Sequence, residues 1–222
     1  AALHTTKSNN PLGIDIKTPK DTLPFHPYFT VKDMWFLGAF LIVYAAAVFW
    51  APNFMGHPDN YIPADPLKTP AHIVPEWYFL PFYAILRSID FNIWFIDAKL
   101  LGVIAMFASI AILAFLPWLD TSPVRSARFR PLYKWFFWVL AIDTVILGFV
   151  GANPPDDPSW FGMSWKNLGL LATLYYFFHF VILMPVLGRV ERPKPLPYSI
   201  AEPVLGGGGS PAGAPAKPME KA

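Results

Sequence analysis

Four long runs of apolar residues divide the chain, and segments rich in polar residues or proline separate them. Each run is about 20 residues long, the length that a helix needs to cross the hydrocarbon layer of a bilayer. The sequence therefore predicts four transmembrane helices, at about Met34–Ala51, Leu100–Leu119, Trp135–Val150 and Leu168–Leu187. The expected fold class is an all-α integral membrane protein.

The segment between the first two spans, residues 52–98, is too long for a plain connection, and loops of this length usually carry function. Its first part is dense in turn residues. Its second part, Glu76–Ile89, predicts an amphipathic helix of about four turns that lies in the membrane interface and is interrupted near Pro81. Pro75 suits the first turn of this helix, because an N–H group would have no partner there.

Composition supports a membrane protein. Hydrophobic residues make up 55% of the chain and charged residues 14%, against about 25% charged residues in a typical soluble domain. The chain has no cysteine, which excludes disulfides, thiolate metal sites and a catalytic thiol. No nucleotide-binding glycine loop or nucleic-acid-binding pattern is present, so we expect no nucleic-acid partner.

Basic residues are distributed unevenly between the two sides of the predicted membrane domain. Four spans bring both termini to one side, and Lys and Arg residues prefer the cytoplasmic side. Thirteen of them lie on the side of the termini and four on the other side. This asymmetry predicts that both termini are cytoplasmic and that residues 52–98 lie on the outer face.

The two ends of the chain differ from the spans. Residues 1–33 are interpreted as the end of a preceding helix and a cytoplasmic segment, residues 34–188 as a four-span domain, and residues 189–222 as a tail. The tail is rich in Pro, Gly and Ala, which is typical of disordered segments. The chain begins at Ala1-Ala2-Leu3-His4, without an initiator methionine, so we expect it to be the second half of a larger protein.

Glu76 is the first candidate for chemistry. It stands in the aromatic, nearly uncharged segment Pro75-Glu76-Trp77-Tyr78-Phe79. An ionisable group in such a segment at a membrane surface costs free energy unless it has a task, such as moving a proton. The simpler interpretation is an interfacial carboxylate that pairs with Arg87 or caps a helix.

Three motifs resemble a known family. They are Pro75-Glu76-Trp77-Tyr78, Gly56-His57-Pro58-Asp59-Asn60-Tyr61, and Leu3-His4 followed by Ser8-Asn9-Asn10-Pro11-Leu12-Gly13. Together they resemble the C-terminal half of cytochrome b, the membrane subunit of ubiquinol:cytochrome c reductase, in its alphaproteobacterial and mitochondrial form. The resemblance runs from His4 to about Arg192 and implies that the four spans are the last four of the family's eight helices. Asp90–Asp97 looks like a small insertion relative to mitochondrial forms.

The resemblance implies a quinol oxidation site on the outer face. Its residues here are Pro75, Glu76, Trp77, Tyr78, Phe79 and Tyr83. In the family the glutamate accepts a proton from the quinol hydroxyl and releases it outward. The residue types agree, because a flat apolar ring needs aromatic walls and one or two polar anchors. For Phe79 and Tyr83, plain core packing is the alternative.

The resemblance also implies a quinone reduction site on the inner face. The matching residues are His4, Ser8, Phe25, Lys32 and Asp33. Reducing a quinone consumes two protons, so a histidine and a carboxylate near its carbonyls make chemical sense. The alternatives are a helix-end histidine for His4 and a snorkelling pair at a span boundary for Lys32 and Asp33.

The implied substrates are ubiquinol and ubiquinone. A complete cytochrome b holds two b-type haems through histidine pairs, and only His179 lies inside a predicted span, so we expect no haem ligand and no other metal site in this chain. The implied partners are the N-terminal half of cytochrome b, a Rieske iron–sulfur protein and a cytochrome c1-type subunit, in a homodimeric complex of the bacterial inner membrane. The competing hypothesis is a quinone-binding or structural membrane subunit without redox activity of its own.

Two polar residues lie inside predicted spans. A lone carboxylate such as Asp143 is costly there unless it is paired, protonated or hydrated. We expect Asp143 to form a structural hydrogen bond to another helix, in preference to a proton path. His179 is interpreted as a packed polar residue rather than a ligand, and His72 has no assignment.

Overall fold

The computed structural model describes residues 10, 12–14, 22–54, 56, 58–63, 65–68 and 73–200. Within these ranges the chain is helical, and its β pairs are limited to the isolated bridges Ile93–Ile96 and Pro158–Ser164. The chain divides into two compact units. The first comprises Ala1–Ala51, Ser122–Lys134 and Glu191–Ala222, and the second comprises Pro52–Thr121 and Trp135–Val190.

The first unit contains the helix α2, Thr30–Trp50, preceded by the π-helical turn η2, Phe25–Phe29. It also contains a small apolar core, formed by Leu12, Ile14, Val124 and Phe129 with Ile200 packed against it. A turn at Asn10 shapes one side of this core, because the Asn10 side-chain oxygen accepts hydrogen bonds from the N–H groups of Leu12 and Ile14. The 3₁₀ turn η5, Ala127–Phe129, leads from this core toward α6, Pro131–Ala152.

Glu191 fastens the chain after the last helix to the start of α6. Its Oε1 atom accepts hydrogen bonds from the N–H groups of Leu132, at 2.6 Å, and Tyr133, at 3.2 Å. Its Oε2 atom lies 3.6 Å from Nε of Arg130, and both side chains of this ion pair are buried. A carboxylate at this place satisfies N–H groups that have no partner within the helix and opposes the positive end of the helix dipole.

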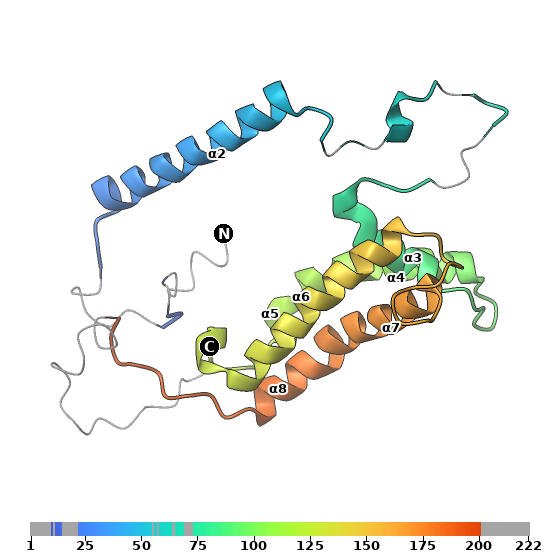
Figure 1. Cartoon of the computed structure of the whole chain (residues 1–222). Coiled ribbons are helices and arrows are strands. Elements are labelled where there is room, and N and C mark those ends of the chain that lie inside the picture. The colour runs from blue at the N-terminus through green and yellow to red at the C-terminus, as the bar shows by residue number, and fades with distance from the viewer. Residues whose placement is uncertain are drawn as a thin grey trace. The chain divides into compact units, whose positions relative to one another are not determined.

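The second unit is a bundle of apolar helices. Its elements are α4, Ala98–Ala114; α5, Leu116–Leu119; most of α6; and the continuous run of α7, Trp165–Phe178, η6, His179–Leu183, and α8, Met184–Val190. Helices α6 and α7 lie side by side, and the Tyr175 hydroxyl of α7 donates to the Phe136 carbonyl of α6 (Figure 1). The short helix α3, Leu80–Ser88, packs against α4 and α7.

The all-α fold class is confirmed, with one boundary corrected. Three helical runs in the described part of the chain are long and apolar enough to cross a membrane: Phe25–Trp50, Pro131–Ala152 and Trp165–Val190. The predicted span Leu100–Leu119 is present as α4 and α5, so its continuity was wrong. The break lies close to Pro117, which has no N–H group to donate to the preceding turn. At the end of α4 the Phe115 N–H donates to the Ile112 carbonyl, three residues back, rather than four residues back as in an α-helix.

The segment Asp90–Asp97 forms a tight reversal. The backbones of Ile93 and Ile96 exchange hydrogen bonds of 3.1 and 2.9 Å, and Trp94 at the tip has φ of 52°. The Asp90 carboxylate accepts a hydrogen bond of 2.6 Å from Lys166 Nζ at the start of α7. This hydrogen bond holds the pKa of the Asp90 carboxyl below its usual value.

We predict that Glu191→Ala destabilises the protein by about 3–5 kcal/mol, because it removes one member of a buried ion pair. Glu191→Gln keeps an acceptor for the Leu132 and Tyr133 amides and should cost less. Thermal unfolding in detergent measures both, with Asp97→Ala as an exposed acidic control. Equal unfolding temperatures for Glu191→Ala and the control would show that the contacts of Glu191 with the start of α6 do not stabilise the protein.

Candidate functional site

The segment Pro75–Tyr83 contains all the predicted outer-face residues and joins an extended chain to a helix. Glu76 has extended backbone angles, φ −58° and ψ 151°, and precedes the 3₁₀ turn η4, Trp77–Phe79. Helix α3 follows directly. Pro81 lies in the first turn of α3, where a missing N–H costs nothing, so it does not interrupt the helix as predicted. Pro75 lies before the first turn rather than in it.

Helix α3 approaches its neighbours at backbone distance. Its Ala84, Ile85 and Ser88 are buried. A Cβ atom added at Gly151 of α6 would collide with the Leu80 carbonyl oxygen, and one added at Gly102 of α4 would collide with the Leu86 carbonyl oxygen. Only residues without a side chain allow both contacts, so these two glycines determine where α3 lies in the second unit.

Arg87 anchors the last turn of α3 to the end of α6. Its guanidinium donates hydrogen bonds to the Val150 carbonyl, at 3.3 Å, and to the Asn153 carbonyl. The negative end of the α6 dipole favours a cation at this place. Arg87 therefore does not pair with Glu76, and that alternative is wrong.

Tyr83 is held at both ends of its side chain. Its hydroxyl donates to the Ile73 carbonyl at 3.3 Å, and the Arg87 guanidinium lies over its ring, 5.0 Å from the centroid. Phe79, one helical turn earlier, is half-buried and contacts Phe82, with ring centroids 5.7 Å apart. Both rings are thus fixed in place, while part of each remains accessible.

Trp77 and Tyr78 are more exposed. Their rings meet edge to face with centroids 5.8 Å apart, and 60% and 64% of their surfaces are accessible. Large apolar rings exposed to this degree mark a surface that faces lipid, a ligand or a partner.

The Glu76 carboxylate is exposed and weakly held. Its Oε1 atom accepts one long hydrogen bond, 3.4 Å, from the Asn60 side-chain amide. It makes no capping hydrogen bond to η4, so the capping alternative is also wrong. Sequence reasoning missed both Asn60 and Arg87 as residues of this site, although Asn60 stands in one of the quoted motifs.

The predicted inner-face residues are only partly described. Phe25 is 67% exposed and its ring stacks on Phe29 with centroids 6.1 Å apart. Lys32 and Asp33 lie in the first turn of α2, both exposed. Neighbours in a helix point in different directions, and the structure shows no ion pair between these two. The predicted residues His4 and Ser8, and the unassigned His72, lie outside the described residues.

We predict that Gly151→Ala destabilises the second unit by about 1–3 kcal/mol, the usual cost of overpacking. The added methyl group would displace Leu80 and the start of α3. Gly148→Ala is the matched control on the same helix, because a Cβ atom there would meet nothing within 4 Å. Thermal unfolding should separate the two variants, and equal loss in both would show that the close approach of α3 does not matter.

Comparisons with known proteins show which family the chain resembles. The family described as Cytochrome b(C-terminal)/b6/petD matches residues 63–177. The cytochrome b of Rhodospirillum rubrum is 59% identical over 203 residues, 91% of this chain and 47% of that protein. The cytochrome b of Rhodobacter capsulatus is 47% identical over 228 residues, 95% of this chain and 51% of that protein. The chain thus spans about half the length of the curated relatives it matches.

A solved structure is also similar. A chain of a hyperthermophilic respiratory complex III superposes with a TM-score of 0.66 at 38% sequence identity. The superposition covers 79% of this chain and 41% of that chain. The similarity therefore extends beyond the segment that the family match covers.

Proposed function

Because this chain belongs to the cytochrome b family and corresponds to the C-terminal part of its members, we propose that it contributes to a quinol:cytochrome c oxidoreductase. The proposal is supported by the names of its relatives and by its similarity to a chain of a respiratory complex III. The observation that carries it is the exposed, weakly held carboxylate of Glu76, followed three and seven residues later by the packed aromatic rings of Phe79 and Tyr83.

The outer site would oxidise quinol. Loss of two electrons and two protons converts a quinol to a quinone, and one proton needs an acceptor within hydrogen-bond reach. The Glu76 carboxylate suits this role, because it can leave its single long hydrogen bond to Asn60 at little cost. It can then turn to release the proton to water on the outer side.

Phe79 and Tyr83 would form the wall against the quinol ring. An apolar ring binds to aromatic side chains, and a few polar groups fix its orientation. Tyr83 has a fixed place because of its hydrogen bond to Ile73 and the Arg87 guanidinium over its ring. Arg87 is thus a positioning residue for the wall. Pro75, Trp77 and Tyr78 complete the site.

The inner site would reduce quinone and take up two protons. Phe25, with its exposed ring, would pack on the quinone, while His4, Ser8, Lys32 and Asp33 would supply polar contacts and protons. The exposure of Phe25, Lys32 and Asp33 in the structure supports their availability for a ligand.

The haem ligands would lie outside this chain. Two haems held by histidine pairs need four histidines, whereas the described residues contain two, the exposed His26 and the buried His179. These residues do not fit a haem site. We therefore propose an N-terminal half of cytochrome b as the haem-bearing partner, with an iron–sulfur protein and a cytochrome c1-type subunit as electron acceptors.

The proposed location is the bacterial inner membrane, in a homodimeric complex with lipid around it. The uneven distribution of Lys and Arg residues supports cytoplasmic termini. The loop with Glu76 would then lie on the outer side, where the released protons are needed for transport across the membrane.

We predict that Glu76→Gln slows quinol oxidation about 10²-fold in the purified complex, within the range that a positioned general base contributes. The glutamine retains the size and the hydrogen-bonding ability of the side chain but accepts no proton. Haem content and reaction at the inner site should stay normal. Asp97→Asn, on the same loop, is the control and should leave the rate unchanged.

A normal rate in Glu76→Gln would overturn the proton-accepting role. A complex with no quinol oxidation even in the unmodified protein would instead support the competing hypothesis, a quinone-binding or structural subunit without redox activity.

A further inference from the structure

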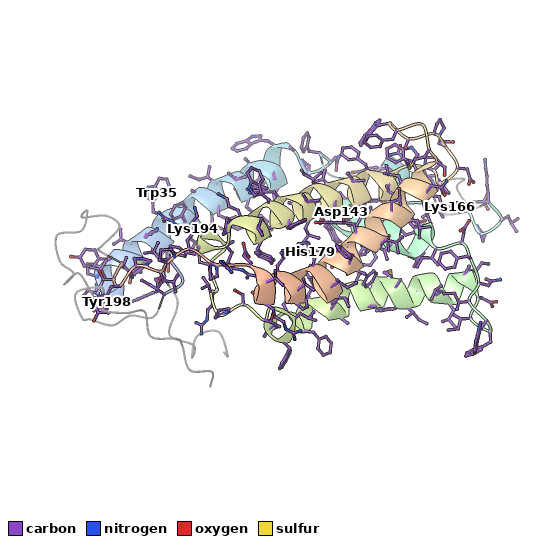
Figure 2. All side chains as sticks on the ribbon, turned by 90° about the horizontal axis from the view of Figure 1, so that it is seen from below. Trp35, Asp143, Lys166, His179, Lys194 and Tyr198 are labelled. Atoms are coloured by element: carbon purple, nitrogen blue, oxygen red, sulfur yellow. The ribbon has the colours of Figure 1, made fainter. Side chains whose placement is uncertain are left out.

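Asp143 lies in the interior of the second unit, far from both ends of α6. It is nine residues from Ala152 and twelve from Pro131, or roughly 14 and 18 Å at 1.5 Å per residue. It is 7% exposed, and the other buried residues of α6, Leu147, Val150 and Gly151, follow on the same face. Figure 2 shows Asp143 and His179 between α6 and α7. The carboxyl group therefore sits at mid-depth of a membrane bundle and faces its neighbours rather than lipid.

No cation on the packed helices lies near this carboxyl group. The basic residues of α4 and α7, Lys99 and Lys166, are the second residues of their helices. On α6, Lys134 is nine residues away, and the Arg87 guanidinium of α3 binds the carbonyls at the far end of α6. An ionised Asp143 would stand without a counter-ion in a low-dielectric interior, which disfavours the charged form.

The titratable neighbours are phenols and one histidine. Asp143 is near enough to Tyr175 and Tyr176 for electrostatic interaction with both. The Tyr176 hydroxyl is already engaged, since it donates to the Ser109 carbonyl of α4 at 2.8 Å. The Tyr175 hydroxyl lies 3.3 Å from the Phe136 carbonyl and 3.4 Å from Nδ1 of His179. The hydrogen bonds of these two hydroxyl groups thus go to backbone carbonyls and to His179 rather than to Asp143.

Two buried oxygens of α6 and α7 have no hydrogen-bond partner among the described residues. They are Oδ2 of Asp143 and Oγ1 of Thr173, which is 4% exposed and lies about one helical turn before Tyr176 on the buried face of α7. Buried polar atoms in native proteins almost always have a partner, either protein or ordered water. Asp143 and Thr173 are 7% and 4% exposed, so a small partner such as a water molecule suits both groups.

We propose that Asp143 and Thr173 form an internal site that binds water and holds Asp143 as a neutral carboxylic acid. A protonated carboxyl group has one donor and remaining acceptor capacity, and the Thr173 hydroxyl has both functions. A buried water molecule typically makes about three hydrogen bonds to such groups. The site keeps one proton at mid-depth of the bundle at neutral pH, independently of quinol chemistry at Glu76.

Infrared spectroscopy of the purified complex tests the site. We expect a carboxylic acid C=O band at neutral pH that Asp143→Asn removes and the control Asp97→Asn retains. The band should shift in D₂O, and Thr173→Val should shift it to higher frequency because the carbonyl loses hydrogen bonding. If Asp143→Asn removes no acid band, Asp143 is ionised and the proposal is wrong. If Thr173→Val and D₂O leave the band unchanged, the carboxyl group is dry and the water site is wrong.

A second measurement needs no variant, so it does not depend on whether the substituted proteins assemble. A high-resolution density map of the unmodified complex should show a water molecule in contact with Asp143 Oδ2 and Thr173 Oγ1. A map that shows these side chains well and no water between them would overturn the site.

Discussion

The close approach of α3 to the glycines of α4 and α6 is the contact on which the candidate site depends. The carbonyl oxygens of Leu80 and Leu86 occupy the space that side chains would fill at Gly151 and Gly102. This contact determines the position of the backbone of α3. The positions of Tyr83, within α3, and of Glu76, four residues before it, follow from that backbone. Tyr83 thus lies on a packed helix, whereas Glu76 lies on the extended chain that leads into this helix.

Close contacts and hydrogen bonds also hold the other helices of the bundle together. In a bilayer, apolar side chains gain little by leaving lipid for each other, so small residues and hydrogen bonds between helices hold the helices together. The Tyr176 hydroxyl joins α7 to α4 through Ser109, and the Tyr175 hydroxyl joins α7 to α6 through Phe136. The Thr121 hydroxyl reaches the Pro185 carbonyl of α8 at 2.8 Å. Asp143 and Thr173 belong to the same set of buried polar groups, with the difference that a water molecule is the partner we propose.

Sequence reasoning located the helices because the length of an apolar run depends only on local composition. It missed the break at Phe115, since hydropathy does not register the N–H group that Pro117 lacks. It placed Pro81 in the middle of a helix because it began that helix too early, at Glu76. Helix boundaries depend on single hydrogen bonds, which periodicity does not determine.

The polar contacts were harder to predict than the helices. The alternative that paired Arg87 with Glu76 rested on charge alone, but in the folded chain the Arg87 guanidinium donates to the carbonyls of Val150 and Asn153 instead. Asp143 was expected to form a hydrogen bond to another helix; its Oδ2 atom has none among the described residues, and the expectation stays a prediction. A sequence shows which groups need a partner, whereas only the packed helices determine which partner lies within reach.

The most direct test of the central claim is a structure of the assembled complex with a quinone analogue bound on the outer side. The account predicts that the analogue's ring lies against Phe79 and Tyr83 and that one of its oxygens is within hydrogen-bond distance of the Glu76 carboxylate. An analogue that inhibits quinol oxidation but binds without contact to the Pro75–Tyr83 segment would contradict the account.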